Sequence, residues 1–312
     1  MNIKSLQIIV FVTLSTVALA QQRYQAIRIS TFANETVGLS QAGPYVLANT
    51  QSGVTLSALN ANSAGTFAGQ NTNYQVCEGN ASGIQSLASL VGTFAQIWAI
   101  NDNGTMVGYS EAGIYSDNYQ AFVIESGVAH RIPTLGGVSG SAEAVSTNNL
   151  VAGHSMRSNG IINAILWNGT KIADLGSLGG THYFSNTNRT FASDAWGVNA
   201  SSEVVGSSWI PNGQQRAFLW KTGRMSNLGT LGGNQSWATA INDSGVVLGG
   251  STLANGLSHG FIYLKGKLFD LNSLVSGLRS GIYINYASQL NNAGQILANG
   301  SDGNIYLLEP IT

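Results

Sequence analysis

The sequence predicts an all-β fold, a six-bladed β-propeller built from four-stranded repeats of about 45 residues. Three observations support this prediction. A set of short segments returns along the whole chain after residue 21. Between them, short apolar runs alternate with turns rich in Asn, Asp, Ser and Gly, and no stretch keeps an apolar face at helical spacing for three turns.

Each repeat contains three recognisable segments, which are best preserved between residues 216 and 251. They read Arg-Ala-Phe-Leu-Trp from Arg216, Leu-Gly-Thr-Leu-Gly-Gly from Leu228, and Ala-Ile-Asn-Asp-Ser-Gly-Val-Val-Leu-Gly from Ala240. Other copies of the third segment begin at Gly38, Ala99, Ala144, Gly197 and Gln289. Together with the copy at Leu228, copies of the second segment at Leu87, Ile132, Leu175 and Leu271 are 45, 43, 53 and 43 residues apart, which is typical of propeller blades.

Within the repeat at 217–251 we expect four strands, named a (217–221), b (225–231), c (238–242) and d (246–251). The Asn-Asp-x-Gly sequence between c and d caps its own turn and supplies a glycine for positive φ, so this link is a tight hairpin. The a–b link is equally short. The b–c and d–a links are longer and vary between repeats.

The two ends of the repeat region are complementary. Residues 24–30 have the pattern of strand b, and residues 304–308 have the pattern of strand a. Because a and b are hairpin neighbours elsewhere, we expect the terminal strands to pair and to close the ring of six blades, which removes the free sheet edges. Another blade count and an open β array, which would need polar caps, are the alternatives.

Residues 1–20 are predicted to form a secretory signal peptide, which ends at Val17-Ala18-Leu19-Ala20. A transmembrane anchor is the alternative, but the apolar run is short and is interrupted by Thr and Ser. Residues 21–312 are then expected to form a single repeat domain that is secreted, either extracellular or periplasmic, with no membrane span after cleavage.

The composition limits the classes of partner. Only 9% of residues are charged and the formal net charge is -1, which excludes a nucleic-acid partner held by bulk electrostatics. A surface of hydroxyl and amide groups suits a carbohydrate or another cell-surface ligand, and equally a turn-rich β protein without a ligand. The single cysteine, Cys77, precludes an internal disulfide and is expected to be a buried apolar residue.

The combination of x-Ala-Phe-Leu-Trp, Leu-Gly-Thr-Leu-Gly-Gly and Ala-Ile-Asn-x-x-Gly-x-Val-Val-Gly-x-Ser resembles the HAF repeat of extracellular bacterial proteins. The resemblance covers residues 24–308. The eponymous His-Ala-Phe tripeptide is altered here, because the only histidine in that place, His259, is followed by Gly260 and Phe261. The resemblance implies secretion and a propeller-like fold, and it implies no particular chemistry.

Strand parity predicts where a ligand would bind. If neighbouring strands are antiparallel, the a–b and c–d turns share one rim, and the variable b–c and d–a links share the other, which we call the long-loop rim. Variable loops on a rigid scaffold are where binding residues concentrate. The candidate ligand-binding residues are His154, Arg157, His182, Tyr183, Arg189, Trp209, Arg216, Trp237 and His259.

Many of the aromatic and charged residues have a structural explanation as an alternative to ligand binding. Trp98 and Trp196 precede strand-c positions and are expected to pack between blades, whereas Trp167 and Trp220 end strand a and are expected in the core. Trp209 and Trp237 depart from the repeat pattern, which favours stacking on a ligand. An insertion at 181–194 combines histidine, aromatic, arginine and aspartate residues. Asp102 and Asp243 lie in repeated turns and are expected to be structural.

No catalytic, cofactor or metal motif is present. Gly153-His154-Ser155 lacks the second glycine of a nucleophile elbow, and no His or Cys pair has zinc spacing. Three hypotheses follow: a secreted binding or adhesion propeller, a structural component of the cell envelope or matrix, and a hydrolase or lyase on a propeller scaffold. Carboxylates or histidines that converge at the long-loop rim would indicate an enzyme, and exposed aromatic residues without such a cluster would indicate binding.

Overall fold

Strands occupy most of the chain that the computed structural model describes, which comprises residues 23–29, 35–40, 45–49, 54–64, 66–71, 76–80, 83–87, 95–111 and 118–311. Within these residues the one helix is a 3₁₀ turn, η1 (Leu271–Ser273). No helix in this part of the chain has the length and apolarity needed to cross a membrane. The predicted signal peptide lies outside the described residues.

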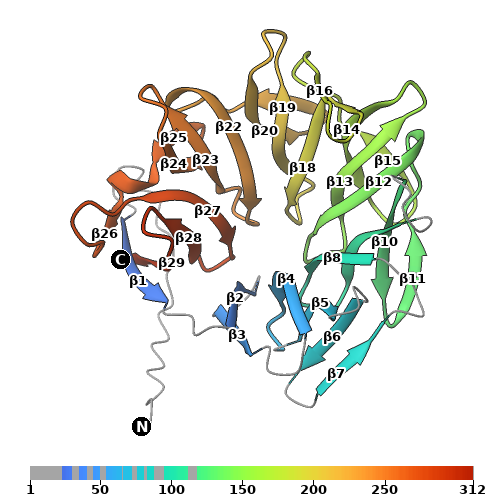
Figure 1. Ribbon diagram of the computed structural model, residues 1–312, viewed down its shortest axis with the longest axis horizontal. Helices are drawn as coiled ribbons and strands as arrows, with labels where there is room; N and C mark the ends of the chain where they lie inside the picture. Colours follow the sequence, from blue (N-terminus) through green and yellow to red (C-terminus); the bar gives the residue numbers. More distant parts are fainter. Residues whose placement is uncertain are drawn as a thin grey trace.

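The described strands form seven sheets, numbered here in chain order (Figure 1). The first contains β2 (Glu35–Leu39) and β3 (Tyr45–Asn49). The second contains β4 (Val54–Ala61), β5 (Phe67–Asn71), β6 (Val76–Asn80) and β7 (Gly83–Ser86). The third contains β8 (Ala95–Ile100), β9 (Met106–Glu111), β10 (Tyr119–Glu125) and β11 (Val128–Arg131).

The fourth sheet is the largest, and an insertion enlarges it. It contains β12 (Gly136–Val145), β13 (Val151–Arg157), β14 (Ile161–Trp167), β15 (Ile172–Asp174), β16 (His182–Phe184) and β17 (Arg189–Phe191). The fifth contains β18 (Ser193–Val198), β19 (Val204–Trp209), β20 (Gln215–Lys221) and β21 (Arg224–Asn227).

The sixth sheet contains β22 (Gly232–Ile241), β23 (Val247–Leu253), β24 (Ser258–Leu264) and β25 (Lys267–Asp270). The seventh contains β26 (Val275–Ser276), β27 (Ile284–Leu290), β28 (Ile296–Gly300) and β29 (Ile305–Ile311), together with β1 (Arg23–Ile29).

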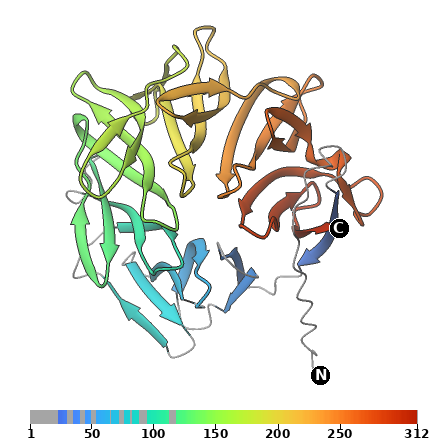
Figure 2. The same cartoon turned by 180° about the vertical axis from the view of Figure 1, so that it is seen from behind.

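The sheets stand around a common centre in the arrangement of a β-propeller (Figures 1 and 2). In the third, fifth and sixth sheets the strand order is c-d-a-b and every neighbour is antiparallel, as in β8-β9-β10-β11. Figure 1 shows strand c nearest the centre and strand b at the outside. The antiparallel order confirms that the a–b and c–d turns share one rim.

The predicted number of blades is not established by these sheets. No copy of the third segment was recognised between those at Gly38 and Ala99, but residues 49–73 contain β4 and β5, which form a further c–d hairpin. The sequence at its turn, Asn62-Ser63-Ala64-Gly65, keeps the Asn-x-x-Gly spacing of other copies but was not recognised as one of them. Six sheets therefore have four or more strands, and the two-stranded β2–β3 sheet lies between the second and seventh, since β2 contacts β4 and β27.

The expected pairing of the terminal strands is confirmed. β1 pairs antiparallel with β29, from Arg23 opposite Ile311 to Ile29 opposite Ile305. The N-terminal segment thus supplies the strand-b position of the seventh sheet. Tyr24 is fully buried there, in one apolar cluster with Leu308 and Ile284.

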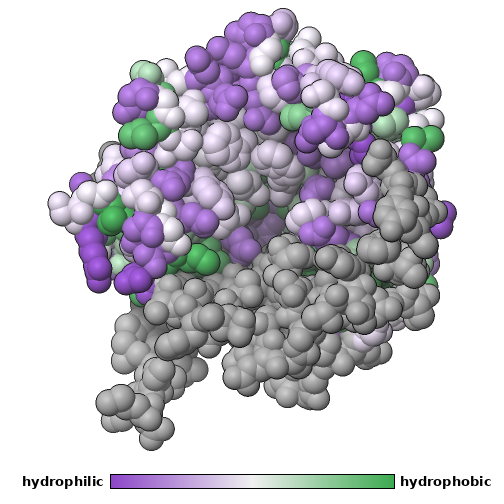
Figure 3. Space-filling model, in the orientation of Figure 1, coloured by the Kyte–Doolittle hydropathy of each residue, from purple (hydrophilic) through white to green (hydrophobic). Residues whose placement is uncertain are grey.

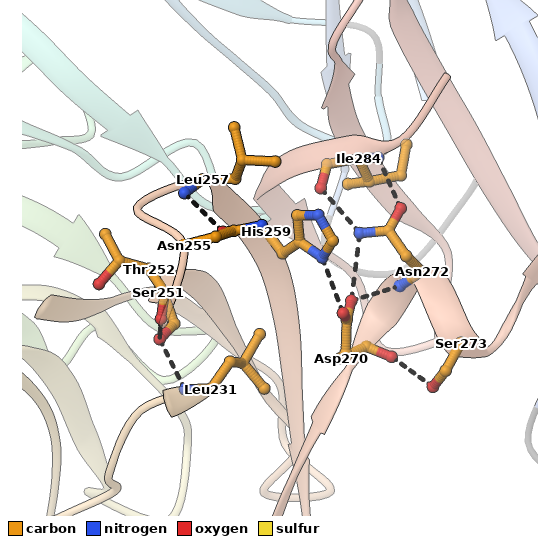
Figure 4. Close-up of polar contacts among 10 residues, drawn as sticks. All are labelled: Leu231, Ser251, Thr252, Asn255, Leu257, His259, Asp270, Asn272, Ser273 and Ile284. Carbon is orange, nitrogen blue, oxygen red and sulfur yellow. Dashed lines mark hydrogen bonds and ion pairs between the residues drawn. The ribbon is translucent and has the colours of Figure 1, made fainter. Parts of the chain in front are cut away.

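Glycine and serine explain why the second segment of the repeat begins strand c. Gly232 has a φ of +105°, which favours glycine, and a Cβ at Gly233 would overlap the backbone of Thr252. The preceding Leu231 N–H donates to the buried Ser251 Oγ at 2.9 Å (Figure 4). These contacts hold the linker against strand d, so β22 starts at Gly232, six residues earlier than expected.

The repeated asparagine of the c–d turn links successive sheets. Asn101 Oδ1 accepts hydrogen bonds from Asn103 N and Thr105 N, and its Nδ2 donates to Ser146 O of the next sheet at 2.8 Å. Asn199 and Asn242 each donate to the following sheet in the same way. The carboxylates of Asp102 and Asp243 accept backbone N–H groups of adjacent sheets, which confirms their structural role.

Apolar clusters fill the spaces between neighbouring sheets. One cluster joins Val107 and Val123 of the third sheet to Val151 and Trp167 of the fourth, so the prediction of a core position for Trp167 is confirmed. Cys77 is also buried, as expected. The rigid scaffold that results positions the polar side chains described next.

Candidate functional site

The innermost strands share a β-bulge that aims one side chain at the neighbouring sheet. From the third sheet to the seventh, the pairing of strand c with strand d shifts register at an equivalent residue of strand c. These bulged residues are Trp98, Glu143, Trp196, Thr239 and Ser288. The orientation is clear at Thr239, whose Oγ1 donates to Ala287 O of the next sheet at 2.6 Å. In the fourth sheet this position carries a carboxyl group.

Glu143, His154 and Asp194 converge at the junction of the fourth and fifth sheets, and we call them the acid–histidine group. His154 Nδ1 lies 3.0 Å from Asp194 Oδ1 and 3.8 Å from Glu143 Oε1. The side chain of His154 is 12% exposed, that of Asp194 is 20% exposed, and that of Glu143 is 16% exposed. The three groups are therefore shielded from bulk solvent but still reachable from it.

The surroundings change the proton affinity of Glu143. Burial, with the nearby Asp194 carboxylate adding to it, raises the pKa of Glu143 to about 7. His154 and the hydrogen bond from Ser141 Oγ, 2.6 Å from Glu143 Oε1, oppose this rise without cancelling it. A carboxyl group of this kind exchanges its proton near neutral pH, as general acids and bases do.

The pKa of His154 is also raised. Burial alone would lower the pKa of the imidazole, but the charge and hydrogen bond of Asp194, with the charge of Glu143, outweigh burial. Arg189 acts in the opposite direction. His154 and Asp194 thus favour an imidazolium–carboxylate pair that joins two sheets.

The insertion at 181–194 forms a short hairpin of β16 and β17, which we call the aromatic hairpin. β17 pairs parallel with the beginning of β14, so the hairpin extends the fourth sheet. His182 stacks on Trp209 with ring centroids 4.3 Å apart, and Phe184 contacts both rings edge-on. Phe191 continues the ring contacts to His154.

Arg189 lies on the other side of this hairpin. Its guanidinium stands 4.7 Å from the centre of the Tyr119 ring, which belongs to the third sheet. Tyr119 in turn contacts Tyr109, and Tyr109 contacts Trp98. Arg189 is only 8% exposed. The hairpin therefore connects an aromatic row of the third sheet with the acid–histidine group.

Two predicted stacking residues are not exposed platforms. Trp209 was expected in a loop, but it ends β19, is 9% exposed and lies beneath His182. Trp237 is half-buried in β22, with its indole against Gly250. Tyr183, by contrast, is 56% exposed, and its hydroxyl donates to Asn188 Oδ1 at 2.7 Å.

Arg157 and Arg216 make contacts away from the acid–histidine group. Arg157 Nε donates to Asp174 Oδ2 at 2.5 Å in an exposed ion pair. Arg216 donates to Asn234 O at 2.6 Å and to Gln214 Oε1 at 2.5 Å, and partial burial lowers the pKa of its guanidinium. Neither arginine joins the candidate site in this arrangement.

His259 forms a separate hydrogen-bonded pair. Its Nδ1 lies 2.7 Å from Asp270 Oδ2, and Asp270 Oδ1 accepts from Asn272 N at 2.9 Å (Figure 4). In the fourth sheet, Asn163 stands at the position of His259 and Asp174 at the position of Asp270. Asn163 Nδ2 donates to Asp174 Oδ1 at 2.9 Å, so strands a and b are linked in a similar way there. We therefore interpret the His259–Asp270 pair as a structural element of the repeat.

The structure thus brings together His154, His182, Tyr183, Arg189 and Trp209 at the third to fifth sheets. Glu143, Asp194 and Tyr119 also belong to this site but were not among the candidate ligand-binding residues, and Glu143 was not singled out from the sequence at all. Asp194 was visible in the inserted segment, and Glu143 stands where two other copies have tryptophan. Aligning strand c of the repeats would have exposed that substitution.

Figure 3 shows the molecule hollowed at its centre, where the inner strands of Figure 1 meet. A shallow pocket elsewhere is lined by residues 232–235 with Thr252, Leu253, Ala254 and Gly256, none of them ionisable. In the part of the chain described, no group of three or more His, Cys, Asp or Glu residues is placed to hold a metal ion.

Comparison with known proteins identifies no family. No family profile matches the chain, and no curated protein matches it in sequence. Among solved structures it is similar to TolB from Acinetobacter baumannii, at 12% identity and a TM-score of 0.44, covering 79% of this chain and 63% of that one. The chain thus spans less than two thirds of that protein's length.

Two further solved structures are similar over most of their length. A putative TolB from Agrobacterium tumefaciens is 9% identical, with a TM-score of 0.49, over 86% of this chain and 94% of that one. A gluconolactonase from Xanthomonas campestris is 11% identical, with a TM-score of 0.43, over 91% of this chain and 100% of that one. At these values the likenesses carry no argument about activity.

Proposed function

We propose that this protein is a secreted binding propeller of the HAF-repeat type, which recognises a carbohydrate or another cell-surface polymer at the long-loop rim of the third to fifth sheets. The observation that carries the proposal is the aromatic hairpin. It interrupts an otherwise regular repeat, and it adds side chains that the scaffold does not need.

The hairpin presents the chemistry that saccharide recognition uses. Tyr183 and His182 are exposed at its first strand, and aromatic faces stack on the apolar faces of sugar rings. The nearby acid–histidine group adds hydrogen-bond donors and acceptors that remain partly exposed. Pockets of this composition, apolar with a few convergent polar groups, are typical ligand sites.

The test is a glycan and cell-surface polymer array probed with residues 21–312, followed by calorimetric titration of each ligand found. Tyr183→Ala is expected to weaken binding by about 1 to 3 kcal/mol. The matched control is Val128→Ala. Val128 is similarly exposed, but it is the first residue of β11 and directly follows an a–b turn on the opposite rim. Absence of any ligand, or equal effects of the two variants, would favour a structural component of the cell envelope.

A second candidate function is acid–base catalysis on the same ligand. It is favoured by the convergence of Glu143, His154 and Asp194, which is the arrangement stated above to indicate an enzyme, and by the pKa of Glu143 near neutral. A hydrolase or lyase would use such a carboxyl group to donate or accept a proton at the bond that breaks. Incubation of a bound polymer with the protein should then release shorter products, and Glu143→Gln should abolish their release while binding persists.

A further inference from the structure

Arg189 is a buried cation without an acceptor. Its side chain is 8% exposed, and no carboxylate, carbonyl or hydroxyl oxygen among the described residues accepts a hydrogen bond from its guanidinium. Among the described residues, its guanidinium stands over the Tyr119 ring, 4.7 Å from the ring centre. Removing a guanidinium from water without pairing it costs several kcal/mol. Such an arrangement is unusual unless a ligand supplies the acceptor.

The remaining charges of the site do not neutralise Arg189. Asp194 is engaged by His154 at 3.0 Å and lies beyond ion-pair distance of the arginine. Glu143 receives a hydrogen bond from Ser141 and faces His154. With the His154–Asp194 pair balanced and Glu143 protonated, the junction carries one uncompensated positive charge.

We propose that Arg189 binds a single carboxylate of the ligand, so that the polymer recognised at the aromatic hairpin is an acidic saccharide; this inference rests on the proposed function. The planar fork of a guanidinium matches a carboxylate in two parallel hydrogen bonds. One free positive charge balances one carboxylate. Tyr119 supports the guanidinium from one face, which leaves its N–H edge for the ligand.

The site's position explains how a nearly neutral protein selects an acidic ligand. With a formal net charge of -1, the protein has no bulk attraction for polyanions, so recognition depends on this one desolvated contact. The neighbouring groups that titrate are Glu143 and Asp194 on the inner strands, His154 on β13, and Tyr109 with Glu111 on β9. Ionisation of Glu143 places a second negative charge at the junction, so affinity should fall as pH rises through 7.

The experiment is calorimetric titration of the full domain with oligogalacturonate and with its methyl ester, which has the same sugar backbone but carries a neutral methyl ester in place of each carboxylate. We expect the acid form to bind at least about ten-fold more tightly than the ester at pH 6. Arg189→Met should remove this preference and leave the thermal midpoint of the ligand-free protein unchanged or raised, because no protein acceptor is left unpaired. The control is Arg224→Gln, which removes an exposed cation from β21.

The outcomes separate the two proposals. Equal binding of the acid and the ester, with Tyr183→Ala still weakening both, would overturn the carboxylate site and leave saccharide binding intact. A preference that survives Arg189→Met would also overturn it. Preferential binding of dextran sulfate over both oligogalacturonate and dextran would overturn the assignment to a carboxylate. If none of these saccharides binds, and the array finds no ligand, both proposals fail.

Discussion

His154 Nδ1 lies 3.0 Å from Asp194 Oδ1, and the two residues belong to different sheets, His154 to β13 and Asp194 to β18. The contact joins strand d of one repeat to strand c of the next. In the equivalent places of the fifth and sixth sheets stand Ser207 and Trp237, which form no such pair. A titratable link between sheets is thus a local addition to the repeat.

Replacing Asp194 by asparagine should lower the pKa of both partners. The negative charge of Asp194 raises the pKa of Glu143 and of His154, so its removal favours the deprotonated form of each. NMR titration of the His154 ring and of a labelled Glu143 carboxyl would measure the two shifts. An unchanged His154 pKa would show that the ion pair does not form in solution.

Glu143→Gln should change how stability depends on pH. The folded-state pKa of Glu143, about 7, lies above the ordinary value of 4.5 for a glutamate, so the folded state binds the extra proton between these values. Wild-type stability therefore falls as pH rises from about 4.5 to about 7, by on the order of 3 kcal/mol at 1.36 kcal/mol per pKa unit. The variant should lack this part of the decline. Urea unfolding of both proteins at several pH values measures the difference, and parallel curves would contradict the prediction.

Ser208→Ala should destabilise the fold by about 1 to 3 kcal/mol, because Leu178 N loses its acceptor and Ala192 O keeps only the hydrogen bond from Trp209 N. Ser208 is fully buried, and its Oγ accepts from Leu178 N at 2.9 Å and donates to Ala192 O at 2.9 Å. Chemical denaturation is the measurement. Ser226→Ala, at an exposed position of β21, is the control and should stay within about 0.5 kcal/mol of wild type.

Deleting residues 300–312 should abolish cooperative unfolding. The deletion removes β29, which lies between β1 and β28 in the seventh sheet, and so splits the sheet: β1 keeps only its two-residue pairing with β26, and β28 keeps only β27. A milder variant, Tyr24→Ala, should cost about 3 to 5 kcal/mol, since Tyr24 is fully buried. A truncated protein that still gives a sharp thermal transition in circular dichroism would show that the terminal strands are dispensable.

Cys77 should resist thiol reagents while the protein is folded. The residue is 1% exposed, and burial raises the pKa of its thiol to about 11, so the reactive thiolate is scarce at pH 8. Labelling with a maleimide should become fast only in denaturant. Rapid labelling of the native protein would place Cys77 at an accessible surface instead.

Local chemistry in the sequence determined the strands, the turns and the pairing of the two ends. These features depend mainly on neighbouring residues in the sequence, so they can be predicted from it. They are the alternating apolar residues, the capping asparagines such as Asn242, and the paired glycines at 232–233. The same reading undercounted the repeats, because the copy at Asn62 was not recognised.

The tertiary structure decided which polar residues meet. Glu143, His154 and Asp194 come from three strands, and Arg189 reaches Tyr119 across 70 residues of chain. Their contacts depend on how far each sheet turns relative to the next and on the bulge at Glu143, which sequence spacing does not encode. Packing also decided how exposed each side chain is. Trp209 was expected in an exposed loop, but it lies at the end of the buried strand β19, and the His182 ring stacks on its indole.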